Sequence, residues 1–248
     1  MVESTSLGGW LFERWLRSPL SPVPRRGEED AVSPGDAKLR PETDLSEKLF
    51  GWPDIDFAPD NCVISKFGHE PHKQKAAGDV GIDFSLPTTT GTSVRLSELL
   101  KKGPVLMCAV APSCPHCVAY ASDMETFAKE VPITCLAVTV MSPHPENEMC
   151  FETGKKWEVP HSKGVSQAKT LEERLRWAEL IKEKMPSWVV VADDLSDKIN
   201  PWWSTYGPAP RCAYLVHATG LICHSWLWWE PDQVRTAVQA YLAQVEQA

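Results

Sequence analysis

The stretch PVLMCAVAPSCPHCVAYASDMETFAKE, residues 104–130, carries the most informative pattern in the chain. Its first seven residues form a continuous apolar run of strand length, which is typical of a strand covered on both faces. The residues after CPHC predict a helix, because apolar side chains recur there at helical spacing. That helical face is formed by Cys117, Ala121, Met124 and Ala128. The CPHC sequence therefore lies between a buried strand and the start of a helix.

The segments downstream continue the alternation of strands and helices. Apolar runs predict strands at 133–140 and 188–193, and the run 212–228 predicts two strands joined by a turn at 218–220. Between the first two of these, 170–185 reads as a helix that Thr170 and Glu173 begin as a capping box. This order predicts an α/β fold, with a mixed central sheet and helices on both of its faces.

The last helix is expected to begin at Pro231, a residue favoured at the first helical position. The residues expected to face inward from it are Val234, Val238, Tyr241 and Val245.

The region before this domain has a different composition. We expect residues 1–75 to form an extension and linker, and residues 76–248 to form the α/β domain. Residues 7–17 form a short amphipathic stretch with Trp10 and Trp15, which would either dock on the domain or contact a protein partner or membrane surface. Residues 18–48 are rich in proline and charge and indicate a linker or extended arm.

The bulk composition restricts the classes of partner. A formal net charge of −8 over 248 residues argues against nucleic acid, which needs clustered lysine and arginine. No apolar run approaches the roughly 20 residues of a transmembrane helix. The first residues lack the basic and apolar segments of a secretory signal, so we expect a cytoplasmic chain. The eleven tryptophans predict aromatic packing in a large core, or else a surface for partners.

Cys114 and Cys117 are the candidate catalytic residues. The start of a helix favours a thiolate, and a spacing of three brings both sulfurs close enough to exchange a disulfide. His116 between them can add positive charge or a hydrogen bond. We expect the Cys114 thiolate to attack a disulfide or an oxidised sulfur and Cys117 to resolve the intermediate, with no cofactor.

Two other interpretations of the dithiol remain open. A structural zinc site needs four ligands, and here Cys223 and His224 would have to fold alongside the pair. The dithiol could also be a non-catalytic remnant of a redox fold. The cysteines within apolar runs, Cys108, Cys135 and Cys212, are expected to be small buried hydrophobic residues.

From about residue 76 onward the chain resembles thioredoxin-fold proteins, and CPHC is the sequence used by the bacterial disulfide-oxidase branch. The segments QAKTLEERLRWAEL, MPSWVVVADDLSDKINPWWSTYG and PAPRCAYLVHATGLI look like the iodothyronine deiodinase family and its bacterial relatives. The resemblance implies a thioredoxin-like three-layer α/β/α sandwich. It also places Cys114 where that family carries a catalytic selenocysteine.

The resemblance implies further residues near the substrate. His144, in VTVMSPHPE, falls where the family has a catalytic histidine, and Arg211 resembles an arginine near the substrate in deiodinases and thiol peroxidases. Thioredoxin folds also carry a cis-proline that faces the dithiol. Pro210 is the favoured candidate, with Ala209 offering its backbone to substrate, and Pro208 is the alternative.

Two departures from these families limit the reaction. Selenocysteine is absent, which argues against reductive dehalogenation and leaves a dithiol route through Cys117. Cys108 occupies the position at which thioredoxins carry a buried carboxylate, so fast thioredoxin-like turnover is not expected.

The sequence thus supports three hypotheses of different classes. The first is a thiol–disulfide oxidoreductase acting on protein or small-molecule disulfides through Cys114 and Cys117. The second is a deiodinase-like or peroxiredoxin-like thiol reductase that uses Cys114 with His144 and Arg211. The third is a non-enzymatic thioredoxin-fold subunit that docks into a larger assembly through its N-terminal extension.

Overall fold

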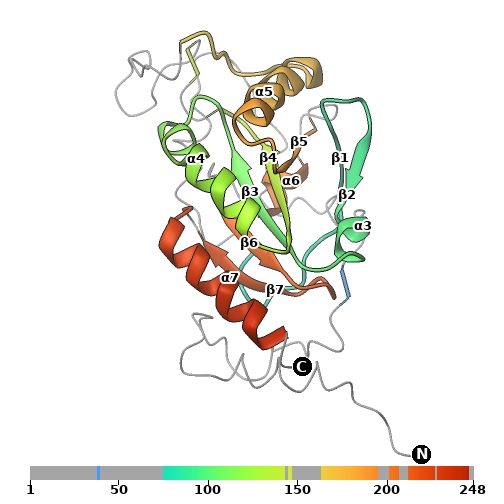
Figure 1. Cartoon of the computed structure of the whole chain (residues 1–248). Coiled ribbons are helices and arrows are strands. Elements are labelled where there is room, and N and C mark those ends of the chain that lie inside the picture. Colours follow the sequence, from blue (N-terminus) through green and yellow to red (C-terminus); the bar gives the residue numbers. More distant parts are fainter. Residues whose placement is uncertain are drawn as a thin grey trace, which may run out of the picture.

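Figure 1 shows the computed structural model of the chain. It describes residues 38–39, 75–142, 145–146, 163–194, 201–206, 212–226 and 228–245.

A five-stranded mixed sheet forms the centre of the described domain, with the strand order β5-β4-β3-β6-β7. Its strands are β3 (Val105–Val110), β4 (Thr134–Thr139), β5 (Val189–Ala192), β6 (Ala213–Val216) and β7 (Ile222–Trp226). β3 pairs in parallel with β4 and antiparallel with β6, and all six of its residues are buried. The apolar runs therefore predicted all five strands, and the mixed sheet is confirmed.

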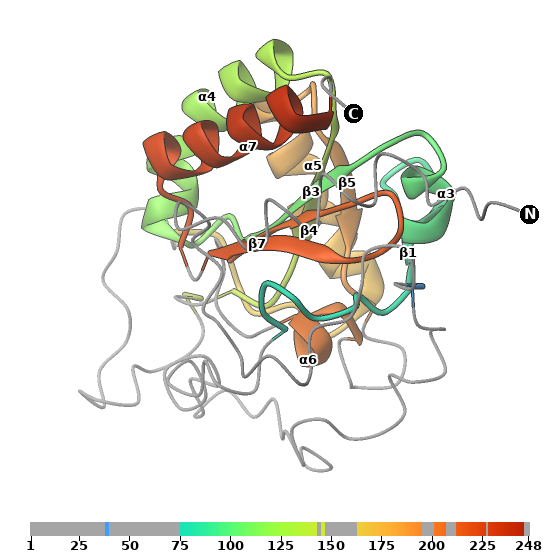
Figure 2. The ribbon, with the colours of Figure 1, turned by 90° about the horizontal axis from the view of Figure 1, so that it is seen from below.

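Helices cover both faces of this sheet, as Figures 1 and 2 show. One face packs against α4 (Pro115–Glu130), α5 (Leu171–Lys184) and α7 (Pro231–Val245). The other packs against α3 (Leu96–Leu100), α6 (Pro201–Tyr206) and the hairpin of β1 (Ser85–Pro87) and β2 (Ser93–Arg95). The three-layer α/β/α sandwich is thus confirmed.

The two long C-terminal helices begin where the sequence predicts. The Thr170 hydroxyl accepts a hydrogen bond from the Glu173 backbone N–H at 3.2 Å, and the Glu173 carboxylate accepts one from Thr170 N–H at 3.2 Å. Both bonds satisfy backbone donors that a helix start leaves unpaired. α7 begins at Pro231 and buries Val234, Val238 and Tyr241. The inward prediction for Val245 is wrong: it is the last residue of α7 and is 47% exposed, since the helix packs through its earlier turns.

Three tryptophans, Trp188, Trp202 and Trp229, are fully buried. Trp188 packs edge-on against Trp229 with ring centroids 5.8 Å apart, and its indole N–H donates to the Met124 carbonyl at 2.9 Å. An indole buried with its N–H satisfied adds core area without an unpaired polar group. The prediction of aromatic core packing therefore holds for these residues.

Side chains on two sides hold α4 in place. The Glu125 carboxylate accepts hydrogen bonds from the Ser187 backbone N–H at 2.9 Å and its hydroxyl at 2.7 Å, just before β5. On the other side, Arg235 of α7 forms an ion pair with Glu130 and lies 5.4 Å over the Phe127 ring. These contacts fix the helix whose first turn carries the dithiol.

One short helix was missed from sequence. α6 spans six residues, which is less than two full turns, so no 3.6-residue periodicity can develop in it. The Asp193 carboxylate accepts a hydrogen bond from the Trp202 backbone N–H at 2.9 Å and so satisfies a donor of its first turn.

Most of the expected N-terminal extension, including Trp10 and Trp15, lies outside the described residues. Leu39 is described, and it packs against the apolar cluster on the α3 and α6 face of the sheet. It lies against Gly220, where a Cβ atom would come within 2.8 Å of the Leu39 backbone nitrogen. At least this residue of the expected linker is therefore in contact with the domain.

Gly220 provides a test of this contact. Gly220 has φ +97°, and an added Cβ would also meet Leu39, whereas Gly91 has φ +79° with open space around it. Gly91→Ala should lower the free energy of unfolding by about 1 kcal/mol from backbone strain alone. Gly220→Ala should cost roughly 1–3 kcal/mol more, because it adds a steric overlap. Urea unfolding measures both, and equal losses would show that Leu39 is not held against Gly220.

Candidate active site

The dithiol lies where β3 passes into α4. After Val110 the chain turns, and the Cys114 backbone N–H donates to the Ala111 carbonyl at 3.1 Å. Cys114 is the N-cap residue of α4 and Pro115 the first helical residue, so Cys117 falls in the first turn. The first turn carries no acidic residue that would oppose the positive end of the helix dipole. The predicted strand-to-helix position of the dithiol is thus confirmed.

Both sulfur-bearing residues are buried, Cys114 with 2% and Cys117 with 3% of its surface exposed. Cys114 is therefore no more accessible than Cys117. Cys114 and Cys117 are not joined by a disulfide in the structure.

Burial raises the pKa of the Cys117 thiol well above its usual value. A hydrogen bond with Cys114 and the charge of Cys114 raise this pKa further, and so does the charge of Cys108. A backbone hydrogen bond involving Ala111 lowers it. Cys117 therefore keeps its proton near neutral pH. Sequence patterns alone did not reveal that Cys108 affects this thiol.

The residue between the two cysteines lies on the surface. His116 is exposed, and its ring centroid is 6.0 Å from that of Trp228, which is 43% exposed. Trp228 precedes α7 and was not among the predicted site residues. The cluster of tryptophans in WLWWE was the only signal for it, and that signal did not distinguish Trp228 from the buried Trp229.

Buried polar side chains brace the loops at this edge of the sheet. After β4, the Gln167 amide accepts from the Ser142 backbone N–H at 2.9 Å and donates to its carbonyl at 3.1 Å. After β5, Asp193 lies near the fully buried Arg174. Burial lowers the pKa of Arg174 to about 10, against the opposing effect of Asp193 and Asp194, so its guanidinium remains charged at neutral pH.

The other predicted site residues, His144, Ala209, Pro210 and Arg211 with the alternative Pro208, lie outside the described residues. The chain is described again from Cys212, whose carbonyl accepts a hydrogen bond from the Ala109 backbone N–H at 2.9 Å. β6 thus starts beside the end of β3. The roles given to these residues stay predictions.

Within the described segments, no group of three or more histidine, cysteine or acidic residues is arranged to hold a metal ion. Cys223 and His224, the partners a zinc site would need, are adjacent on β7, where successive side chains point to opposite faces. Cys223 belongs to the apolar cluster under α4, and His224 stacks on Trp226 with ring centroids 5.3 Å apart.

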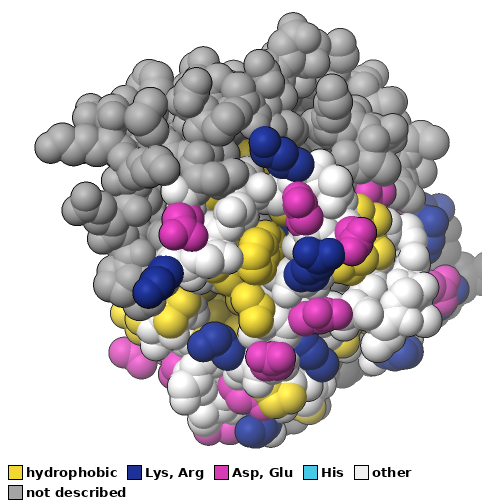
Figure 3. All heavy atoms as spheres, turned by 90° about the horizontal axis from the view of Figure 1, so that it is seen from above, with side chains coloured by type: hydrophobic (Ala, Val, Ile, Leu, Met, Phe, Trp, Pro, Cys, Tyr) yellow, Lys and Arg dark blue, Asp and Glu magenta, His cyan; other side chains and the backbone are white. Residues whose placement is uncertain are grey.

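Figure 3 shows in space-filling view how charged and apolar side chains are distributed over one face of the molecule. Acidic and basic side chains are interspersed there with apolar ones, and no continuous basic stripe crosses the described surface in that view. No described helix combines the length and apolar character needed to cross a bilayer.

The Redoxin family model matches residues 76–197, which include the dithiol. This match, with the sheet order and the dithiol at the start of α4, supports a domain of the thioredoxin-like superfamily and an oxidoreductase. No curated protein matches the chain.

Several solved structures are similar at low identity. The exposed lipoprotein thioredoxin Etrx1 of Streptococcus pneumoniae is 19% identical over 64% of this chain and 98% of its own, with TM-score 0.42. The peroxidoxin BcpB of Mycobacterium tuberculosis is 17% identical over 67% and 97%, with TM-score 0.43. MTB DsbF is 17% identical over 63% of this chain and 93% of its own, with TM-score 0.44. At these values the likeness does not bear on function.

The causes of the raised Cys117 pKa lead to a test. Removing Cys114 removes two of the effects that raise this pKa, whereas burial, the largest, remains. In Cys114→Ala, the pH midpoint for alkylation of Cys117 should fall relative to the parent protein but stay above the ordinary thiol value of about 8.5. Peptide-resolved mass spectrometry after timed iodoacetamide labelling measures the midpoint. An unchanged midpoint would show that the two thiols are not coupled.

Proposed function

We propose that this protein is a thiol–disulfide oxidoreductase that uses Cys114 as nucleophile and Cys117 as resolving thiol. The observation that supports the proposal is the asymmetry of the pair: Cys114 occupies the N-cap position of α4, at the positive end of the helix dipole, whereas Cys117 is held protonated by burial and by Cys114 itself. An attacking thiol must be ionised, and a resolving thiol must stay protonated until the mixed disulfide has formed.

The reaction balances within the dithiol. The Cys114 thiolate attacks one sulfur of a substrate disulfide, which forms a mixed disulfide and releases the other sulfur as a thiolate that takes up a proton. Cys117 then loses its proton and attacks Cys114, which releases the second substrate thiol. The substrate is reduced by two electrons and Cys114–Cys117 becomes a disulfide; run in reverse, the same steps oxidise a dithiol substrate.

His116 and Trp228 are the described surface side chains that would meet a substrate first. Both are exposed, their ring centroids lie 6.0 Å apart, and His116 is two residues from the buried Cys114. Aromatic groups of this kind contribute contact area at low entropic cost. His144, Ala209, Pro210 and Arg211 complete the proposed substrate-binding set from the family resemblance.

A second candidate, a thiol peroxidase, is favoured by the 2% exposure of Cys114. A peroxide is small enough to reach a sulfur that a folded protein substrate does not. The thiolate would attack one peroxide oxygen and break the O–O bond, which gives a sulfenic acid and releases the other oxygen as water or an alcohol after it takes up a proton. Cys117 would then condense with the sulfenic acid to give the disulfide and water. The deiodinase-like alternative and the non-enzymatic subunit remain predictions from sequence.

Cys114→Ala should lower the rate of insulin disulfide reduction, with dithiothreitol as the electron donor, by about a hundredfold or more, because it removes the nucleophile. Cys135→Ala is the matched control: Cys135 lies in the same apolar cluster, on β4, and has no part in the proposed reaction. Equal activity of the two variants would contradict the proposal.

Cys117→Ala separates the two candidate reactions. Mixed with glutathione disulfide, it should accumulate a glutathione adduct on Cys114, because the resolving thiol is missing. Mixed with hydrogen peroxide, it should accumulate a sulfenic acid that dimedone traps. An adduct with glutathione but no faster peroxide consumption than free cysteine would exclude the peroxidase, and the reverse result would exclude the disulfide exchange.

A further inference from the structure

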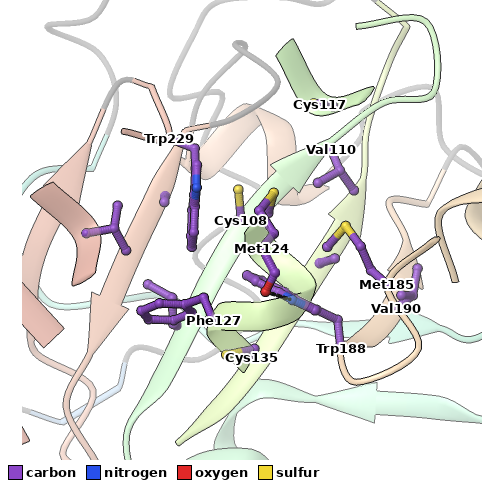
Figure 4. Packing of buried hydrophobic residues seen from close by; sticks show 14 of the residues in the cluster. Cys108, Val110, Cys117, Met124, Phe127, Cys135, Met185, Trp188, Val190 and Trp229 are labelled. Carbon is purple, nitrogen blue, oxygen red and sulfur yellow. Dashed lines mark hydrogen bonds between the residues drawn. The ribbon is translucent and has the colours of Figure 1, made fainter. Parts of the chain in front are cut away.

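A third thiol lies under the dithiol. Cys108 is fully buried in the middle of β3, and its side chain belongs to the same apolar cluster as Cys114 and Cys117. Successive strand residues point to opposite faces, so Cys108 shares with Val110 the face of β3 that α4 covers. Figure 4 places Cys108 and Cys117 in this cluster, with Met124 and Trp229 beside them.

Cys108 differs from the other buried cysteines in its relation to the site. The charge of Cys108 contributes to the raised pKa of Cys117. No other cysteine contributes to the raised pKa of Cys135, Cys212 or Cys223. Cys135 pairs in register with Leu106, which puts it two residues, about 7 Å, further from the dithiol edge than Cys108. Cys212 packs on the opposite face of the sheet.

We propose that Cys108 is a third redox-active thiol, which exchanges with the Cys114–Cys117 disulfide to form an internal Cys108–Cys117 disulfide. This inference rests on the proposed function, because that function supplies the starting disulfide. It assigns the site a second oxidised form, in which the disulfide is buried in the core and Cys114 is again a thiol.

The exchange needs no further oxidant. The Cys108 sulfur attacks the Cys117 sulfur, the Cys114–Cys117 bond breaks, and the Cys108–Cys117 bond forms. The proton leaves Cys108 and is taken up by the departing Cys114 sulfur. One disulfide is consumed and one is made, so no net electrons move. All three residues are buried, so the exchange would take place within the apolar cluster.

The internal disulfide would change what the oxidised protein can do. In the Cys114–Cys117 form, the site can pass its disulfide to a dithiol substrate. In the Cys108–Cys117 form, both linked sulfurs are buried, and Cys114 can only form mixed disulfides that Cys117 cannot resolve. The exchange therefore holds the disulfide in a form that does not include the proposed nucleophile, Cys114.

The test uses the full chain, oxidised with glutathione disulfide, acid-quenched, alkylated and digested for disulfide mapping. The parent protein should yield both the Cys114–Cys117 and the Cys108–Cys117 linked peptides. In Cys114→Ser, oxidised at alkaline pH so that Cys117 ionises, Cys117 should take glutathione first and Cys108 should displace it, so that Cys108–Cys117 becomes the main product.

Two double variants provide the matched comparison. Cys108→Ala in the Cys114→Ser background should abolish this product and leave Cys117 carrying glutathione. Cys223→Ala in the same background should retain it, because Cys223 is equally buried in the same cluster but on β7. Circular dichroism establishes that each variant is folded. If a variant fails to fold, native iodoacetamide labelling of Cys114 in the oxidised parent protein gives the same information, since the exchange frees that thiol.

The two proposals fail in different ways. A parent protein with the Cys114–Cys117 link, together with a Cys114→Ser variant that has no Cys108–Cys117 link, would overturn the third-thiol inference and leave the proposed function intact. A parent protein with neither link would overturn both.

Discussion

The pairing of β3 on both of its edges is the constraint on which the rest of the domain depends. β3 is hydrogen-bonded to β4 on one side and to β6 on the other, and none of its residues reaches solvent. A strand held in this way cannot slip by one residue without turning its whole buried set to the wrong face. The point at which it ends, and therefore the position of Cys114 one turn later, is fixed by the whole sheet.

The chemistry of the site follows from that position. Because β3 ends under the start of α4, Cys114 occupies the N-cap position of the helix and Cys117 its first turn, and both are buried in the apolar cluster below. The same strand carries Cys108 into this cluster, so the electrostatic environment of Cys117 is set by residues on both sides of the turn. Glu125 and Arg235 act at a distance by holding α4 over the sheet. The reactivity of the dithiol is thus a property of the packed layers, not of the four-residue sequence alone.

Much of this architecture could be predicted from the sequence, and the misses have physical causes. The buried strands and the capped helix at Thr170 were predicted because apolar runs and caps are local signals. α6 was missed because it is too short for periodicity, and Val245 was misplaced because periodicity does not reveal how far along a helix its packing extends. The neighbours His116 and Trp228 come from distant segments that only the tertiary fold brings together. Burial of Cys114 has the same origin, since a residue's neighbours in space are not encoded in its local pattern.

Leu39 has a consequence for how the domain is defined. Composition changes near residue 76, and a fragment cut there would retain every strand and helix of the sheet layers. It would, however, lack the side chain that lies against Gly81 and Gly220 and joins the apolar cluster with Tyr206 and Ile222. Such a fragment would expose to water the apolar atoms that Leu39 covers in the full chain. Leu39, upstream of the segment that looks like a domain in the sequence, thus contributes to the packing of that domain.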